Sequence, residues 1–131
     1  MSGTHTPTIQ ITDIHTIGIP VGNVDRAIEF YVGQLGLELR MDAAYGEGER
    51  WVEVAPLGAS TTIALVRSGP GIPTGIDTQI RLASSDAVAE HGALRARGVD
   101  VDADIIPYPV PMFAFRDPDG NRLIVVERPH D

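Results

Sequence analysis

The stretch that decides the fold is residues 113–127, FAFRDPDGNRLIVVE. An alternating apolar segment, residues 112–115, leads into Asp-Pro-Asp-Gly, and a second segment rich in β-branched residues follows. Pro118 fixes φ at the first corner of a tight turn, and Gly120 can adopt a positive φ. The two flanking segments are therefore predicted to be antiparallel strands joined by a short hairpin.

The same hairpin pattern occurs earlier in the chain. Residues 50–55 and 61–66 are predicted strands, and a proline and a glycine lie between them. Three pairs of landmark residues are each about 62 positions apart, namely Pro56 and Pro118, Gly58 and Gly120, and Gly36 and Gly98. This constant spacing indicates an internal duplication.

Each copy of the repeat is predicted to have the order β-α-β-β-β. The first copy contains a strand at 14–21, a helix that Asn23 caps, and a strand at 37–43 before its hairpin. The second contains a strand at 78–83, a helix that begins near Asp86 and ends at Gly98, and a strand at 99–106 before its hairpin.

The expected fold is therefore α+β. Two βαβββ modules form a curled mixed sheet, a half-barrel, around a central cavity, and the helices lie outside it. The predicted organisation is a flexible N-terminal arm followed by one domain, with these bounds: arm 1–12, domain 13–131, first module 13–67, linker 68–76 and second module 77–128.

Composition excludes several classes of partner. The chain has 131 residues, 43% of them hydrophobic, and a net charge of −8. Nucleic acids and anionic membranes attract basic surfaces, so neither is expected as a partner. The chain has no cysteine, no signal-peptide pattern and no apolar run of membrane-spanning length, which together predict a cytoplasmic protein.

Four segments of the chain resemble the vicinal-oxygen-chelate superfamily, which is the glyoxalase, bleomycin-resistance and extradiol-dioxygenase group. These segments are IPVGNVDRAIEFYVGQLGLEL (19–39), RWVEVAPLGASTTIALV (50–66), LRARGVDV (94–101) and FRDPDGNRLIVVE (115–127). The resemblance implies the two-module fold and a homodimer. It does not select a reaction, because the superfamily includes isomerases, dioxygenases, thiol transferases and drug-binding proteins.

The resemblance also implies four metal-ligand positions, one on the first and one on the last strand of each module. They correspond to Thr16, Ala64, Gln79 and Ile124. Only the glutamine has a suitable donor, and divalent cations need several His or carboxylate ligands, so no metal cofactor is expected. The alternative is a divalent metal such as Zn, Ni, Mn or Fe, with ligands recruited from His15, Glu53, Gln79 and Glu127.

Without a metal, Ala64, Ile124 and Val126 would give the cavity an apolar floor suited to a hydrophobic or aromatic small molecule. Trp51 and Glu53 share one strand face, and Trp51 is interpreted either as a stacking platform for a ligand or as core or dimer packing. The candidate ligand-binding residues are Trp51, Glu53, Gln79, Arg81, Tyr108, Met112, Phe113, Phe115 and Ile124.

Three functions remain open from the sequence. The first is a metal-free protein that binds or sequesters a small molecule such as a drug. The second is a metal-dependent lyase or dioxygenase of the same superfamily. The third is a metal-free enzyme in which Arg81 and Glu53 form an acid–base centre, although the same two residues could be a structural ion pair.

Overall fold

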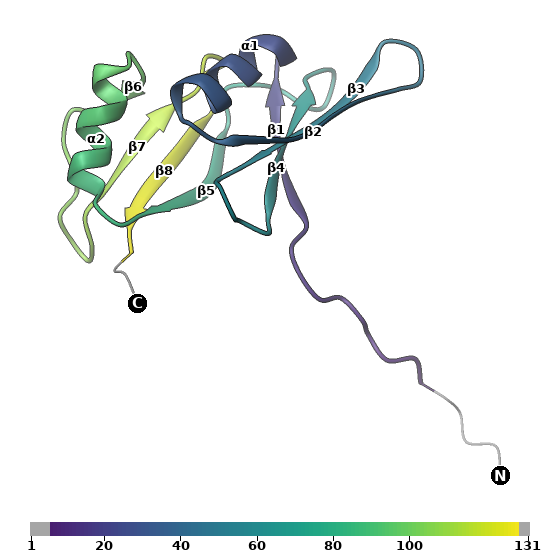
Figure 1. The fold of residues 1–131 in the computed structure, drawn as a ribbon, viewed down its shortest axis with the longest axis horizontal. Coiled ribbons are helices and arrows are strands. Elements are labelled where there is room, and N and C mark those ends of the chain that lie inside the picture. Colours follow the sequence, from purple (N-terminus) through teal and green to yellow (C-terminus); the bar gives the residue numbers. More distant parts are fainter. Residues whose placement is uncertain (1–5, 129–131) are drawn as a thin grey trace.

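The strands form two four-stranded mixed sheets in the computed structural model, which describes residues 6–128 (Figure 1). Residues 1–5 of the predicted arm and residues 129–131 of the predicted domain lie outside the described residues. The elements are β1 (Thr16–Val21), α1 (Val24–Ile28), the π-helix η1 (Glu29–Gln34), β2 (Glu38–Tyr45), β3 (Glu49–Ala55), β4 (Thr62–Arg67), β5 (Asp77–Ser84), α2 (Ala87–Ala96), β6 (Asp100–Val101), β7 (Met112–Arg116) and β8 (Arg122–Glu127).

The two sheets have the same topology, which confirms the α+β class and the two-module organisation. The first sheet has the order β1-β4-β3-β2 and the second has the order β5-β8-β7-β6. In each, the first and last strands of the module pair in parallel, and the other pairs are antiparallel. Asn23 and Asp86 cap α1 and α2 through their side chains, as their positions predict.

One predicted strand is much shorter than expected. Residues 99–106 were predicted to be a continuous strand, but β6 contains only Asp100–Val101, and Ile106 forms a single bridge to Met112. The amide of Asp102 still donates to the carbonyl of Ala114 at 2.9 Å, but the chain bends at Ala103 and Asp104. The segment between β6 and β7 therefore leaves the sheet.

The core lies on one face of each sheet, where the helices pack. In the first sheet this face presents Ile19 and Val52, and in the second it presents Leu123, all fully buried. Phe30 of η1 joins the modules, because its ring lies 6.3 Å from that of Phe115 on β7. No helix within residues 6–128 is both long and apolar enough to cross a membrane.

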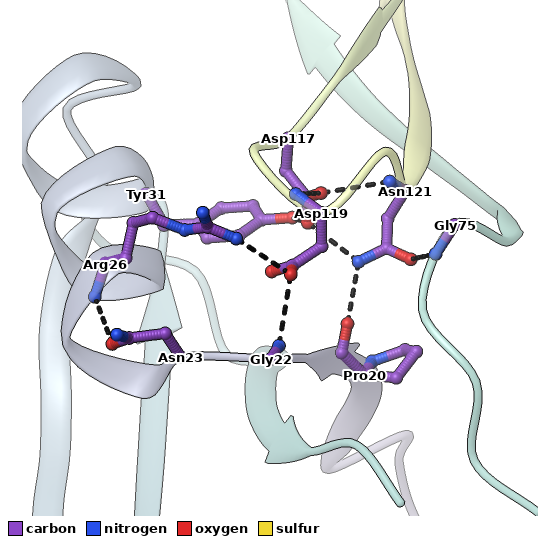
Figure 2. Close-up of polar contacts among 9 residues, drawn as sticks. All are labelled: Pro20, Gly22, Asn23, Arg26, Tyr31, Gly75, Asp117, Asp119 and Asn121. Carbon is purple, nitrogen blue, oxygen red and sulfur yellow. Dashed lines mark hydrogen bonds and ion pairs between the residues drawn. The ribbon is translucent and has the colours of Figure 1, made fainter.

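The hairpin turn that defines the second module also holds the two modules together (Figure 2). The Asp117 carboxylate accepts hydrogen bonds from the Tyr31 hydroxyl at 2.7 Å and from the Asn121 side chain at 2.9 Å. Asn121 also donates to the carbonyl of Pro20 at 2.7 Å, and its side-chain oxygen accepts from the amide of Gly75 at 2.9 Å. Residues about 100 positions apart in the sequence are thereby fixed by buried hydrogen bonds.

The same turn reaches the start of α1. Asp119 accepts hydrogen bonds from the amide of Gly22 at 3.2 Å and from the Arg26 guanidinium at 3.0 Å (Figure 2). Burial and the nearby Asp117 carboxylate raise the pKa of Tyr31 well above its usual value, so this hydroxyl stays protonated and donates to Asp117. The two modules are therefore held together by the hydrogen bond from the neutral Tyr31 hydroxyl to the buried Asp117 carboxylate, as well as by apolar packing.

Candidate functional site

Each sheet has an open face, which we define as the face opposite the helix-packed core. Strand pairing places Gly18, Ala64, Glu53 and Met41 in one row across the open face of the first sheet. The corresponding row in the second sheet contains Arg81, Ile124 and Ala114. The first row thus contains a carboxylate at its centre, whereas the second has aliphatic side chains there.

Glu53 is the polar centre of the first module's open face. Its side chain is buried, with 5% of the residue exposed. One carboxylate oxygen accepts a hydrogen bond from the Thr62 hydroxyl at 2.6 Å, and the other accepts from the Trp51 indole N–H at 2.7 Å. His15 Nε2 lies 3.9 Å from the second oxygen. The predicted shared face of Trp51 and Glu53 is confirmed, whereas Thr62 was missed, although it lies two residues from Ala64 on the same strand face.

The hydrogen bonds from Thr62 and, to a smaller extent, Trp51 lower the pKa of Glu53 below its ordinary value of 4.5. The carboxylate is therefore ionised at neutral pH. Arg81 does not contribute to this shift. Its guanidinium donates to the carbonyl of Gln79 at 3.1 Å, so within one chain the expected pair between Arg81 and Glu53 is not formed.

Glu53→Gln is expected to remove a pH-dependent contribution to stability. A carboxyl group whose pKa is lowered by folding stabilises the protein above its unfolded pKa and loses this effect as the pH falls through the folded pKa. The free energy of unfolding of the wild type relative to Glu53→Gln should therefore be greater at about pH 7 than at about pH 3. Urea unfolding at both pH values measures this, with the exposed Glu47→Gln as the control. If the difference in free energy of unfolding between the wild type and Glu53→Gln stayed constant or grew in acid, a lowered pKa of Glu53 would be contradicted.

A cavity of about 360 Å³ opens on the second module. Met112, Phe113 and Ile124, all predicted ligand-binding residues, line it together with Ala114 and Ile106. Asp102 and Asp104 add carboxylates to its wall. Tyr108, another predicted ligand-binding residue, is 82% exposed and is not among the lining residues.

β7 directs Phe113 and Phe115 toward the helices, although Phe113 is also among the residues that line the cavity. Phe113 pairs with Val125 and Phe115 pairs with Leu123, so both rings lie on the helix-packed face and are buried. Phe113 packs edge-to-face against His91 with a centroid distance of 4.9 Å. The residues of the second module that occupy the open face are instead Met112 and Ala114, which alternate with the two phenylalanines.

Arg81 and Gln79 lie away from this cavity. Arg81 lines a second hollow of about 630 Å³ between the modules, together with Ile17 of β1 and Ile63 of β4. Gln79 has a φ of 61° and lies where the pairing of β5 with β8 shifts. Exposure nevertheless alternates along β5, and Gln79 and Arg81 are both exposed.

The donor set does not fit the superfamily's metal site. Ala64 and Ile124 have no ligand atoms, and Thr16 donates its hydroxyl to the carbonyl of Thr62. Glu127, an alternative ligand, accepts a hydrogen bond from the amide of Ala87 at 3.0 Å and so stabilises the start of α2. Within residues 6–128, no three His, Asp or Glu side chains are grouped to hold a metal ion. The His15 and Glu53 pair supplies only two ligands.

Comparison with known proteins places this geometry in a family. The model of the Glyoxalase/Bleomycin resistance protein/Dioxygenase superfamily matches residues 13–125. A search of curated proteins finds no match.

Solved structures agree with the family match. TnmS3, an antibiotic-binding protein from Streptomyces sp. CB03234, is 32% identical, with a TM-score of 0.79, over 92% of this chain and 98% of that one. A member of the superfamily from Sphaerobacter thermophilus DSM 20745 is 32% identical, with a TM-score of 0.84, over 90% and 98%. A glyoxalase/bleomycin resistance protein from Streptomyces sp. CB03234 is 34% identical, with a TM-score of 0.72, over 85% and 96%. The chain belongs to the Glyoxalase/Bleomycin resistance protein/Dioxygenase superfamily.

Proposed function

We propose that this protein binds an aromatic or otherwise hydrophobic small molecule, such as an antibiotic, without the superfamily metal. The observation that carries the proposal is the cavity of about 360 Å³ beside the apolar side chains of Met112, Ala114 and Ile124. Cavities of this size that combine apolar walls with a few polar groups are typical of small-molecule sites. The similarity to the antibiotic-binding TnmS3 supports the same ligand class.

We further propose that a second copy of the chain completes the site. The cavity is lined only by residues of the second module, whereas Trp51 and Glu53 lie on the open face of the first. β2 is an edge strand of that sheet, and its Met41 and Tyr45 are 46% and 52% exposed. In a homodimer, the first module of one copy would cover the cavity of the other and bury this apolar surface.

A thermal-shift screen of aromatic antibiotics and metabolites, followed by calorimetry on the compound that stabilises most, tests the ligand class. Ile124→Glu should weaken binding at least about tenfold, because it places a charge in the apolar wall. Val88→Glu is the matched control, since Val88 is exposed on α2 and should leave affinity unchanged. Equal affinity in Ile124→Glu and the wild type would reject this cavity as the site.

Two further measurements on the same protein test the two-copy site and the absence of a metal. Sedimentation velocity should give a dimer that binds one ligand per chain, and a monomer that binds ligand with full affinity would reject the two-copy site. Titration with Zn, Ni, Mn and Fe(II) should give no tight binding. Stoichiometric metal binding that disappears in His15→Ala would instead favour a metal-dependent lyase or dioxygenase.

A further inference from the structure

We propose that Glu53 determines the specificity of the site by binding a protonated amine of the ligand, while the ligand's aromatic ring packs against Trp51. This inference rests on the proposed small-molecule function and specifies its ligand class, which is a cationic aromatic compound. It follows from the hydrogen-bonding capacity of Glu53, from its missing counter-charge and from its neighbours on the open face.

Glu53 has unused hydrogen-bonding capacity. An ionised carboxylate can accept about four hydrogen bonds. The buried Asp117 uses this capacity with the Tyr31 hydroxyl, the Asn121 side chain and the amides of Asp119 and Asn121. Glu53 is buried to the same degree and receives hydrogen bonds only from Thr62 and Trp51 within the described residues. Asp117 is therefore saturated as a structural group, whereas Glu53 retains acceptor sites for a ligand.

Glu53 also differs in charge compensation from the carboxylates at the surface. Asp42 and Asp100 lie near the surface, and each accepts two hydrogen bonds from the guanidinium of an arginine. Glu53 is buried, and both of its hydrogen-bond donors are neutral. The nearest ionisable base is His15, at 3.9 Å, and its side chain is 80% exposed. The hydrogen bonds from Thr62 and Trp51 keep this carboxylate ionised, and a ligand ammonium group would supply the full counter-charge that these neighbours do not.

The residues around Glu53 on the open face differ in size. Its neighbours in the row are Ala64 on one side and Met41 on the other, and Gly18 lies beyond Ala64. The residues on the β1 side of the carboxylate are therefore small. Trp51 lies two residues along the same strand face and is half-buried, so an aromatic ring can pack against its indole while an attached amine reaches Glu53.

Three probes that share one ring and differ in charge test the proposal: 2-naphthylmethylamine, 2-naphthylmethanol and 2-naphthoate. Calorimetric titrations with the wild-type protein near neutral pH should show the amine binding at least about tenfold more tightly than the alcohol. The naphthoate should bind most weakly. Glu53→Gln should bind the amine and the alcohol equally, with the affinity for the alcohol unchanged. Asp42→Asn is the matched control. It removes one negative charge from β2, on the face of the sheet opposite to Glu53, and should keep the preference for the amine.

The outcomes separate this inference from the proposed function. Equal binding of all three probes by the wild type, or a preference for the amine that persists in Glu53→Gln, would overturn the role of Glu53 and leave the aromatic site standing. Binding of none of the three would overturn the aromatic site itself. The wild-type series needs no variant, so it decides the question even if Glu53→Gln fails to fold.

Discussion

Replacing Phe115 with alanine is expected to lower the free energy of unfolding by about 4 kcal/mol. The Phe115 side chain is fully buried, and it packs against Phe30 of η1 with a ring-centroid distance of 6.3 Å. Its removal would leave a cavity between the helix of one module and the sheet of the other. Because neither module has a large core of its own, the two should still unfold in one transition, at a lower urea concentration.

Urea unfolding followed by circular dichroism measures the effect. Tyr108→Ala serves as the control, because Tyr108 is exposed, and should change stability by no more than about 0.5 kcal/mol. If Phe115→Ala lowered the free energy of unfolding by less than about 1 kcal/mol, the packing of the two modules through Phe115 would be contradicted.

Replacing Asn121 with alanine is expected to cost about 3 kcal/mol. Asn121 is fully buried, and its side chain bonds the carbonyl of Pro20, the carboxylate of Asp117 and the amides of Gly75 and Ile76. Alanine would leave the carbonyl of Pro20 and the amides of Gly75 and Ile76 without these partners, and it would remove one of the four hydrogen bonds to Asp117. Each group that stays unsatisfied away from water carries a desolvation cost. The midpoint of thermal unfolding should fall by roughly 10 °C for a domain of this size.

The control for this variant is Asp77→Asn, which weakens the surface ion pair with Arg122. Surface ion pairs contribute little, so Asp77→Asn should lower stability by less than about 1 kcal/mol. If Asn121→Ala and Asp77→Asn had equal stabilities, the network between the modules would not be a main source of stability.

Features of the fold that depend on short sequence patterns were predictable. The turn at Asp117–Gly120, the caps Asn23 and Asp86 and the spacing between the two hairpins depend on a few residues that act locally. The structure confirms each of them. The shared strand face of Trp51 and Glu53 was also predictable, because side chains alternate along a strand without a bulge.

The remaining features depend on contacts that a local pattern does not specify. The bulge at Gln79 shifts the register of β5, and Glu127 binds the amide of Ala87 on a different element. Phe113 and Ile124 lie on different faces of the second sheet. This follows from the pairing of β7 with β8, in which Ile124 is matched with Ala114. Thr62 could be identified as a hydrogen-bond partner of Glu53 only once the register of β3 against β4 was known.

The central claim is that a small molecule binds in the cavity of the second module. The most direct test is methyl NMR of the protein, titrated with the compound that stabilises it most in the thermal-shift screen. We expect the largest chemical-shift changes at Met112, Ala114 and Ile124, which line this cavity. Changes confined to Ile17 and Ile63, which line the hollow between the modules, would place the ligand elsewhere and contradict the claim.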